Sequence, residues 1–515
     1  MNDPGETPRG SAAFYVDPKR GNDGNDGTSP ETAFKTVHKI SSMSFQKGDE
    51  ILFKRGETFN GGLTIKGFGT ADSPIKVGAY GSGSMPKFHP RGAAAGVTVS
   101  ACNIVVDGLE IVNPDGQYGV FITPVKDGEN ENITVQNCYI HDVDIHEAYG
   151  FGYLNSGGII ALALGGSPTW YKNMRLQDNT IKNVCRLAIG LNTAWGWRCR
   201  TDGTISWILN DYQDDDNGWY PNVDCRITGN TIDGTRGDSI LAQCARNLVI
   251  EHNTVYRANS STKAHAQTAM VAVWTISSDN SVMQFNEVGY TTRTSADGEA
   301  FDTDHGDTNC KIQYNYSHNN EGGFVLLCNG DKGASEARNA TVRYNLSVND
   351  GSKNAVIQLI GSVPGSQVYN NTIYLSAGGD VVGMWGNVDD ATKARDVTFT
   401  NNIFAAPTPR GAYVGGGSVG DDFYRAVTDI RFNSNLFHNV NLPEQRDGVS
   451  LSGNVTGDPQ FADSGCAAYE DRAGMIEAFT PTAKVDGAVP IPDNGGQDIN
   501  GAAITDSAFF GCVRH

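Results

Sequence analysis

The sequence predicts an all-β protein that folds as a right-handed parallel β-helix, a solenoid with an N-terminal capping helix and loop insertions. Three observations predict this fold. The 515 residues include 62 glycines and 19 prolines, and only 19% of them are charged, a composition typical of many short strands and turns. Short apolar strands follow one another closely along the chain. A motif that ends in asparagine recurs through most of the length, and such recurrence is typical of solenoids.

The N-terminal segment predicts a cap on this solenoid. A strand and a turn rich in Asn-Asp-Gly precede a short helix whose apolar face would be Phe34, Val37 and Ile40. Such a helix would cover the open end of the core and the bare strand edge. The expected plan is a flexible lead over 1–12, one β-helix domain over 13–515 with its cap at 13–60, loop insertions at 142–156 and 195–222, and a C-terminal tail or cap at 455–515.

The asparagine motif defines the coils. Its form is Asn-(apolar)-x-(apolar)-x-x-Asn, and successive terminal asparagines mostly lie about 20 to 35 residues apart. Asparagine tolerates a left-handed bend, and amides stacked from coil to coil would form a ladder. Further strands between the motifs, such as 270–274 and 355–360, give each coil two or three parallel strands. The terminal asparagines are Asn137, Asn179, Asn230, Asn253, Asn286, Asn315, Asn345, Asn371, Asn402, Asn435 and Asn454.

Charge and hydropathy exclude several classes of partner. The net charge of −19 argues against nucleic acid and against an anionic membrane surface. No window approaches the run of about 18 apolar residues that a membrane-spanning helix needs. The first ten residues lack the apolar core of a signal peptide. We expect a monomer with no nucleic-acid or membrane partner.

The ten cysteines are irregularly spaced and include no CxxC, which argues against a zinc ribbon. Cys138, Cys185 and Cys244 are expected to be small buried side chains in the coils. Two pairs bracket segments of the chain and are candidates for disulfides in an oxidising compartment: Cys199 with Cys225, and Cys466 with Cys512.

An acidic segment at 297–307 is the candidate functional site. It holds five carboxylates and one histidine within eleven residues. Strand alternation places Asp302 and Asp304 on one face and Phe301 on the other. Glu321 follows one coil later, at the mouth of the next strand. This pattern predicts a carboxylate cluster on an outward face of the solenoid.

The chain resembles the pectate-lyase-like right-handed β-helix superfamily over nearly its whole length. The N-terminal segment from Tyr15 to Val37, the coil repeats, and the paired segments Phe-x-x-Asp and Asn-Glu-Gly-Gly-Phe carry the resemblance, and Phe324 of the second would stack on Phe301. The resemblance implies a carbohydrate-active protein: a polysaccharide lyase, a glycoside hydrolase, a sugar epimerase or a phage tailspike.

The acidic segment also resembles a polysaccharide-lyase subgroup that reads Asp-Gly-Phe-x-x-Lys, with Asp-Asp-Gly on the coil above. In that subgroup the lysine is the proton-abstracting base and the aspartates hold calcium. Aligned on Phe301, the lysine position is Asp304 here, and Asn320-Glu321-Gly322 replaces Asp-Asp-Gly. Because the lyase base is missing, we expect a glycoside hydrolase rather than β-elimination.

Glycoside hydrolysis needs one protonated carboxyl and one ionised carboxylate, and crowded acids provide both because like charges raise one pKa. We expect Asp302 and Asp304 to be the acid and nucleophile pair. Glu321 is expected as a third acid or substrate anchor. His305 would tune the proton of Asp304 or bind a sugar hydroxyl.

Other readings of the cluster remain open. It would be a solvated strand face, or a calcium site in which carboxylate oxygens are the ligands. The predicted calcium ligands are Asp297, Glu299, Asp302, Asp304 and Glu321. A calcium-dependent lyase would take its base from Lys263, Arg293 or Lys332. A non-catalytic carbohydrate-binding or tailspike-like protein would bind sugar without turnover. Calcium apart, we expect no cofactor.

The expected substrate is a poly- or oligosaccharide, which implies a secreted or periplasmic protein. Aromatic residues in the insertions suit the apolar faces of sugar rings, unless they only pack the loops onto the coils. The candidate substrate-binding residues are His305, Trp274, Gln243, Glu299, Asp238, Trp195 and Trp219.

Overall fold

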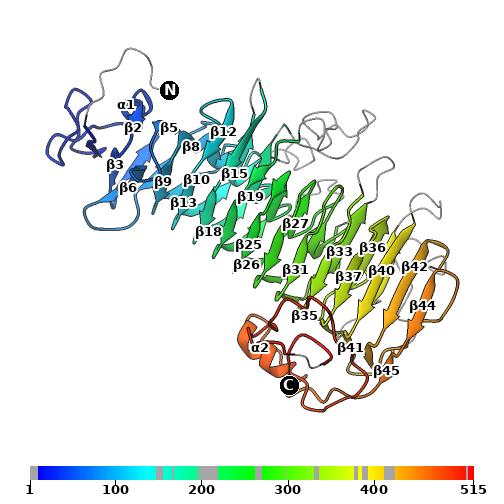
Figure 1. The fold of residues 1–515 in the computed structure, drawn as a ribbon. Coiled ribbons are helices and arrows are strands. Elements are labelled where there is room, and N and C mark those ends of the chain that lie inside the picture. Colours follow the sequence, from blue (N-terminus) through cyan, green and yellow to red (C-terminus); the bar gives the residue numbers. More distant parts are fainter. Residues whose placement is uncertain are drawn as a thin grey trace.

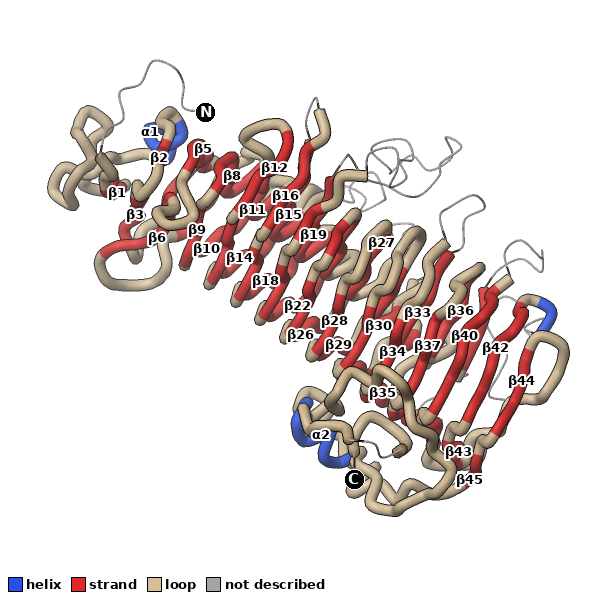
Figure 2. Tube along the Cα trace, viewed as in Figure 1, coloured by secondary structure: helices blue, strands red, loops and turns tan. Residues whose placement is uncertain are grey.

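The protein is an elongated right-handed parallel β-helix, which confirms the predicted fold class (Figure 1). Every pairing between the strands given below is parallel, and the strands lie in three long sheets and one short sheet (Figure 2). The structure is a computed structural model, and it describes residues 10–146, 155–164, 167–193, 195, 219–260, 269–294, 296–329, 336–375, 381–385, 393–410, 424–505 and 508–514.

Sheet A contains 15 strands and runs along the whole solenoid. Its strands are β1 (Ala13–Val16), β3 (Glu50–Lys54), β6 (Ile75–Tyr80), β9 (Ile104–Asp107), β13 (Ile133–Gln136), β17 (Arg175–Gln177), β21 (Arg226–Thr228), β25 (Val249–Glu251), β28 (Val282–Gln284), β31 (Lys311–Gln313), β34 (Thr341–Arg343), β37 (Ser366–Tyr369), β40 (Ala394–Thr400), β42 (Val427–Asn433) and β44 (Val449–Ser452).

Sheet C contains 14 strands, each reached from sheet A through a sharp bend. Its strands are β4 (Thr58–Asn60), β7 (Lys87–His89), β10 (Glu110–Asn113), β14 (Tyr139–Val143), β18 (Thr180–Val184), β22 (Thr231–Thr235), β26 (Thr254–Tyr256), β29 (Glu287–Gly289), β32 (Tyr316–His318), β35 (Leu346–Val348), β38 (Thr372–Tyr374), β41 (Ile403–Ala405), β43 (Leu436–His438) and β45 (Val455–Thr456).

Sheet B contains 12 strands and carries the acidic segment. Its strands are β2 (Phe45–Gln46), β5 (Leu63–Phe68), β8 (Ala95–Cys102), β11 (Tyr118–Ile122), β15 (Gly157–Ala163), β19 (Leu187–Thr193), β23 (Ile240–Gln243), β27 (Val273–Ile276), β30 (Glu299–Thr303), β33 (Gly323–Asn329), β36 (Ile357–Gly361) and β39 (Val382–Trp385). The short fourth sheet consists of β12 (Gly128–Glu131), β16 (Thr169–Lys172), β20 (Asn222–Val223) and β24 (Ala245–Arg246).

The interior between the three long sheets is one continuous apolar core. Side chains of the strands alternate between this core and the outer face, as the period of a strand requires. Phe301 and Phe324 both lie in the core with ring centroids 6.2 Å apart, but the predicted stacking of the two rings is wrong. Their rings meet edge-on, because the strand register places Phe301 opposite Val325.

Ten asparagines form a ladder at the bend between sheets A and C. From Asn179 to Asn454, each Nδ2 donates to the Oδ1 of the ladder asparagine in the next coil, over 2.9–3.1 Å. The predicted ladder is therefore confirmed from Asn179 onward. Asn137 is not a member, because Cys138 occupies that position and donates its backbone N–H to Asn179.

The expectation that the ladder asparagines are left-handed is wrong. The left-handed residue is the one before each ladder asparagine, for example Tyr314 with a φ of 58°. The turn at that residue directs the next side chain into the stack and its own side chain outward. Aromatic rings use the outward positions: Phe285 stacks on Tyr314 at 5.0 Å, and Tyr314 stacks on Tyr344 at 5.8 Å.

Both ends of the solenoid are covered. At the N-terminus, Phe34, Val37 and Ile40 are buried as predicted, although helix α1 (Val37–Ser41) begins only after its N-cap, Thr36. At the other end, helix α2 (Arg472–Ala478) and the following chain fold back over the outer face of sheet C (Figure 1). Neither helix of the described chain is long and apolar enough to cross a membrane.

No disulfide joins two cysteines of the described residues. The predicted disulfide between Cys466 and Cys512 is wrong: Cys512 is buried, and its backbone N–H donates to Thr372 of sheet C over 3.0 Å. Cys225 is likewise a buried thiol, and its predicted partner, Cys199, lies outside the described residues. The buried state expected for Cys138, Cys185 and Cys244 is confirmed.

Candidate active site on the outer face of sheet B

The acidic segment forms strand β30 and the turns on both sides of it. Strand register fixes the direction of its side chains, because Val273, Phe301 and Val325 pair in one row and all lie in the core. The next row, Trp274, Asp302 and Leu326, therefore faces outward. Trp274 and Leu326 belong to a separate apolar cluster on this outer face, so Asp302 lies in largely apolar surroundings.

Asp304 stands at the end of β30 and is held firmly. Its backbone N–H donates to the carbonyl of Thr275 in the preceding coil over 3.1 Å. Its Oδ1 accepts the backbone N–H of His305 over 2.7 Å and lies 3.4 Å from Nε2 of the same histidine. On its other side, the ring of His305 contacts Oδ1 of Asn329 through Nδ1, over 3.2 Å. The Asp304 side chain is 13% exposed.

The carboxylates differ in how deeply they are buried. Glu299 and Asp302 are buried, whereas Asp297, in the left-handed turn before β30, is partly exposed. Within the described part of the chain, both oxygens of Glu299, Oδ1 of Asp302 and the side-chain amide of Gln243 are buried without a hydrogen-bond partner. Native proteins keep few such groups because each costs about 1–3 kcal/mol. Their concentration on one face indicates a site for a polar ligand.

Burial and mutual repulsion keep protons on this cluster. The pKa of Asp297 is raised to about 7 by burial first and then by the negative charges of Asp304 and Asp238, while Arg293 opposes the shift. Burial, and then Asp304 and Asp297, raise the pKa of Asp302 well above its usual value. The pKa of Glu299 is also raised well above its usual value, by burial and then by Asp297. Burial and mutual repulsion thus raise the pKa of three carboxyls in this site above the usual range.

The structure separates Glu321 from this cluster. Its Oε1 pairs with Lys353 over 2.7 Å, and its Oε2 accepts the backbone N–H of Arg293 over 2.8 Å. Glu321 therefore stabilises the backbone of the loop that contains Arg293. For the same reason, the five predicted calcium ligands do not converge in the described residues.

Asp238 is fully buried in an ion pair with Arg186 over 2.6 Å, so it does not lie open to a substrate. Its Oδ1 accepts the backbone N–H of Val271 over 2.9 Å. The neighbouring carbonyl of Met270 accepts the N–H of Gly298, beside Asp297, over 2.9 Å. The pair therefore supports the backbone next to Asp297. Burial raises the pKa of Asp238, and the charge of Arg186 opposes the shift.

Two tryptophans predicted to bind substrate, Trp195 and Trp219, lie at the base of the second insertion. The carbonyl of Trp195 accepts the N–H of Tyr220 over 3.0 Å, which closes the two ends of the insertion. Trp219 is buried under the guanidinium of Arg246, 4.7 Å from the ring centre. This is a packing role, the alternative left open for these residues. The central parts of both insertions and the proposed lyase bases Lys263 and Lys332 lie outside the described residues.

Sequence reasoning missed four contributors to the site. Arg186 and Lys353 lie on other coils than their partners, Asp238 and Glu321. Nothing in the sequence around either residue predicts these ion pairs. Cys328 and Asn329 end β33, where the register Thr303–Leu327 places Cys328 beside Asp304. An alignment of Phe301 with Phe324 would not have predicted that Cys328 lies beside Asp304. In the structure Phe301 pairs with Val325, one residue further along β33.

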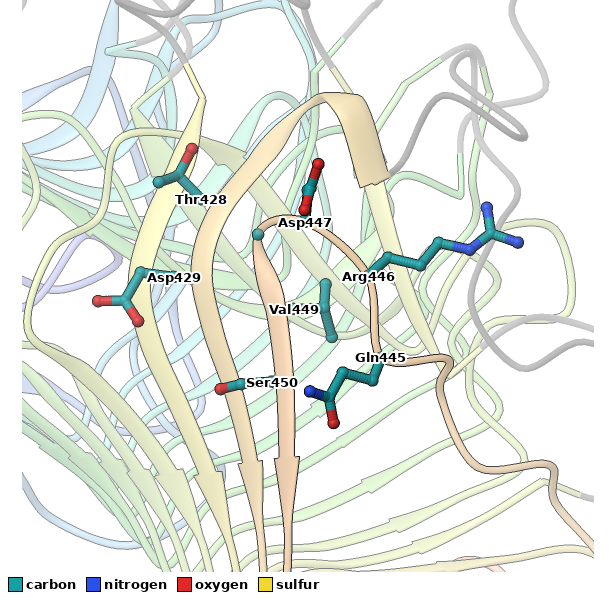
Figure 3. A pocket seen from close by; sticks show the side chains of 8 residues that line it. Thr428, Asp429, Gln445, Arg446, Asp447, Val449 and Ser450 are labelled. Atoms are coloured by element: carbon teal, nitrogen blue, oxygen red, sulfur yellow. The ribbon is translucent and has the colours of Figure 1, made fainter.

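A separate surface pocket of about 620 Å³ lies at the far end of sheet A (Figure 3). It is lined by Thr428, Asp429, Gln445, Arg446, Asp447, Gly448, Val449 and Ser450. Asp429 and Arg446 point in opposite directions, and each pairs with a neighbour, Arg431 and Glu444 respectively. Because no charged groups converge in it, we assign the chemistry to the carboxylates of sheet B instead.

No protein-family model matches the chain. Among curated proteins, it is similar to a lacto-N-biosidase from Bifidobacterium longum subsp. longum, with 26% identity over 99% of this chain and 36% of that protein. The chain thus spans little more than a third of this relative's length. A shorter similarity, to the alpha-1,3-galactosidase A of Akkermansia muciniphila, covers 13% of this chain at 32% identity.

Two solved structures share the architecture. The native GH136 lacto-N-biosidase from Eubacterium ramulus aligns with a TM-score of 0.59 and 22% identity, covering 75% of this chain and 68% of that one. XylC, solved in complex with xylose, aligns with a TM-score of 0.52 and 12% identity, covering 97% of this chain and 98% of that one. At these identities the likeness establishes the fold. The resemblance to the carbohydrate-active, pectate-lyase-like β-helix superfamily is confirmed.

Proposed function

We propose that this chain is a glycoside hydrolase that cleaves a glycosidic bond of an oligosaccharide, with Asp297 as proton donor and Asp304 as the nucleophile or general base. The observation that carries the proposal is the electrostatic interaction between these two acids. Asp297 is partly exposed, the Asp304 side chain is 13% exposed, and the charge of Asp304 helps to raise the pKa of Asp297 to about 7. An acid that keeps its proton near neutral pH beside an ionised carboxylate is the arrangement that glycoside hydrolysis requires.

The assignment differs from the expected pair, Asp302 and Asp304, for a physical reason. Asp302 is buried, and burial and then Asp304 raise its pKa well above the usual value, which disfavours the ionised form that a nucleophile needs. The backbone N–H of His305 orients the Asp304 oxygen and stabilises its negative charge. Asp304 then acts as nucleophile or activates a water molecule.

The substrate class follows from the unsatisfied polar groups and from the relatives. Gln243 and Glu299 offer buried hydrogen-bonding atoms that sugar hydroxyls would satisfy. Similarity to a lacto-N-biosidase, a glycoside hydrolase that acts on oligosaccharides, favours hydrolysis over the alternatives, lyase activity and binding without turnover. We further propose a secreted or periplasmic monomer.

The test is a glycan panel assayed with wild type, Asp297→Asn and Asp304→Asn, following new reducing ends and ultraviolet absorbance together. We expect reducing ends without absorbance, and a loss of kcat of at least about 100-fold in each variant. Asp429→Asn, at an exposed left-handed position that asparagine tolerates, is the matched control and should retain activity. Absorbance from an unsaturated product would support the lyase, and full activity of both site variants would refute the assignment.

A further inference from the structure

We propose that Asp304, His305 and Cys328 form a binding site for a transition-metal ion such as Zn²⁺, and that an ion bound there blocks the active site. Binding of the ion does not depend on the function proposed above. Its inhibitory effect does rest on that function, because it requires Asp304 to act in hydrolysis.

The three side chains already converge. One carboxylate oxygen, one imidazole nitrogen and the cysteine sulfur all lie within 4.8 Å of one another. Tetrahedral zinc binds nitrogen and oxygen at about 2.0–2.1 Å, which places two such ligand atoms about 3.3–3.4 Å apart. Nε2 of His305 lies 3.4 Å from Oδ1 of Asp304. This edge of the coordination tetrahedron is therefore present before any ion binds.

The fold explains why these residues meet. Thr303 of β30 pairs with Leu327 of β33, so the residues that follow them, Asp304 and Cys328, are neighbours on successive coils. Both side chains face outward, on the same side as Asp302 and Leu326. His305 is fixed beside them because its carbonyl accepts the backbone N–H of Ser277 over 2.8 Å.

A supporting contact orients the imidazole. Nδ1 of His305 lies 3.2 Å from Oδ1 of Asn329, and since an amide oxygen only accepts, we assign the proton to Nδ1. The lone pair of Nε2 is then directed toward Asp304. Histidines that bind metals almost always donate their second ring N–H in this way. The site thus has three ligands and a further residue, Asn329, that orients one of them.

The ligand chemistry selects the ion. A thiolate, an imidazole and a carboxylate suit Zn²⁺ and Co²⁺, whereas Ca²⁺ and Mg²⁺ prefer oxygen ligands alone. This site is therefore distinct from the calcium site considered above. An ion held here would engage the Asp304 carboxylate and bring positive charge to the place where that carboxylate must act. Hydrolysis would stop until a chelator removed the ion.

The test uses the full chain without a histidine tag, stripped of metal with EDTA. Co²⁺ titration should produce a near-ultraviolet thiolate-to-cobalt absorption band, and Zn²⁺ should displace it. Cys328→Ser should abolish the band and weaken Zn²⁺ binding at least about tenfold, and Asn329→Ala should weaken it by about 10–100-fold. Cys466→Ser, which removes another half-buried thiol far along the chain, should bind as wild type does. Circular dichroism checks that each variant is folded.

The outcomes separate this inference from the proposed function. Absence of a thiolate band in folded wild type, or unchanged Zn²⁺ affinity in Cys328→Ser, would refute the metal site. A thiolate band without turnover of any glycan would support the site and count against the hydrolase. Hydrolysis that Zn²⁺ fails to inhibit would overturn the blocking role.

Discussion

The charges around Asp297 come from three elements of the fold. Asp304 follows β30, Asp238 precedes β23, and Arg293 lies in the loop before Asp297 itself. Burial and the two acids raise the pKa of Asp297, whereas Arg293 lowers it. Arg186, fully buried against Asp238, balances part of this field. The pKa of the proposed acid is thus raised by its catalytic partner Asp304 and is further adjusted by Asp238 and Arg293, to which the proposed mechanism gives no contact with the substrate.

Asp238→Asn should shift the pH profile. The variant removes a negative charge near Asp297 and leaves Arg186 unbalanced, so the pKa of Asp297 should fall from about 7. A general acid works only while it is protonated. The fall of kcat/KM at alkaline pH should therefore occur at a lower pH in the variant than in wild type. The measurement is kcat/KM against pH. An unchanged alkaline limb in folded protein would contradict this account.

The same variant should also be less stable, by about 3–5 kcal/mol, because it breaks a buried ion pair. Urea unfolding measures this cost. The matched control is the double variant Arg186→Met with Asp238→Asn, which removes both charges. It should recover most of the stability and return the alkaline limb toward wild type.

Glu299→Gln should stabilise the protein at alkaline pH. Burial raises the pKa of Glu299 in the folded state above its unfolded value of about 4.3. Such a group favours folding at pH below 4.3, and that contribution is lost as pH rises through the folded pKa. The variant should therefore be more stable than wild type at pH 8, because it removes a buried carboxyl whose ionisation disfavours the folded state. Urea unfolding at pH 4 and pH 8 tests this, and equal stability at both would argue against it.

At this scale the sequence predicted part of the site. Strand alternation correctly placed Asp302 on the outward face with Asp304 at its end. It gave no means of ranking the acids by burial, which depends on neighbouring coils. The pairing of Glu321 with Lys353 was equally hidden, since nothing in the local pattern of either residue indicates the other.

The most regular element of the molecule is the asparagine ladder. Each ladder amide donates to the next coil and to a backbone carbonyl, and each Oδ1 accepts both a side-chain and a backbone N–H, as Asn315 and Asn345 illustrate. These buried groups would otherwise lack partners, at a cost of about 1–3 kcal/mol each. The ladder therefore fixes the height and register of successive coils.

Asn315→Leu should destabilise the protein by about 2–4 kcal/mol, because it leaves buried groups of Asn286 without their acceptor. Urea unfolding provides the value. Asn309→Gly is the control: its amide pair with Asn280 is exposed, and its φ of 57° suits glycine, so a change below about 1 kcal/mol is expected. Equal losses in both variants would show that burial of the ladder is not decisive.

The ladder was predictable because one amide chemistry repeats at one bend. Its exact geometry was not, since the motif does not tell which of two adjacent residues turns left-handed. The structure places the turn on the residue before the asparagine, where side chains as different as those of His252 and Tyr344 occur. Because these residues share no side-chain type, the sequence does not show that this position is the left-handed one.

Across the whole molecule, the C-terminal tail is the part that departs from simple stacking. It returns along the solenoid and covers aromatic and aliphatic side chains of sheet C, far from its own coil (Figure 1). Phe479 of the tail is buried, with ring centres 4.8 Å from Tyr374 and 5.3 Å from Phe461. The tail thus ties several coils together, whereas an ordinary coil contacts only its neighbours.

Phe479→Ala should destabilise the tail by about 3–5 kcal/mol, because it leaves a cavity among buried rings. Limited proteolysis should then cut the segment after β45 faster, while the coils before β32 stay protected. Leu442→Ala, at a side chain that is 37% exposed, is the control and should behave as wild type does. Unchanged cleavage of the tail in the phenylalanine variant would mean that other contacts hold it.

The overall fold was predictable because the repeat extends over most of the chain. The path of the tail was not, since it depends on contacts between segments far apart in the sequence. The predicted disulfide between Cys466 and Cys512 failed for this reason: Cys512 packs against sheet C instead of joining its neighbour in the tail.

The stacking of β27, β30 and β33 bears on how such a protein can change length during evolution. Duplicating or deleting one complete turn elsewhere would make the rod longer or shorter and leave the chemistry intact. A turn gained between β30 and β33 would instead carry Cys328 and Asn329 one further step of about 4.8 Å away from Asp304. The junction between β30 and β33 is therefore closed to growth, and it is a place where relatives of different size should still match turn for turn.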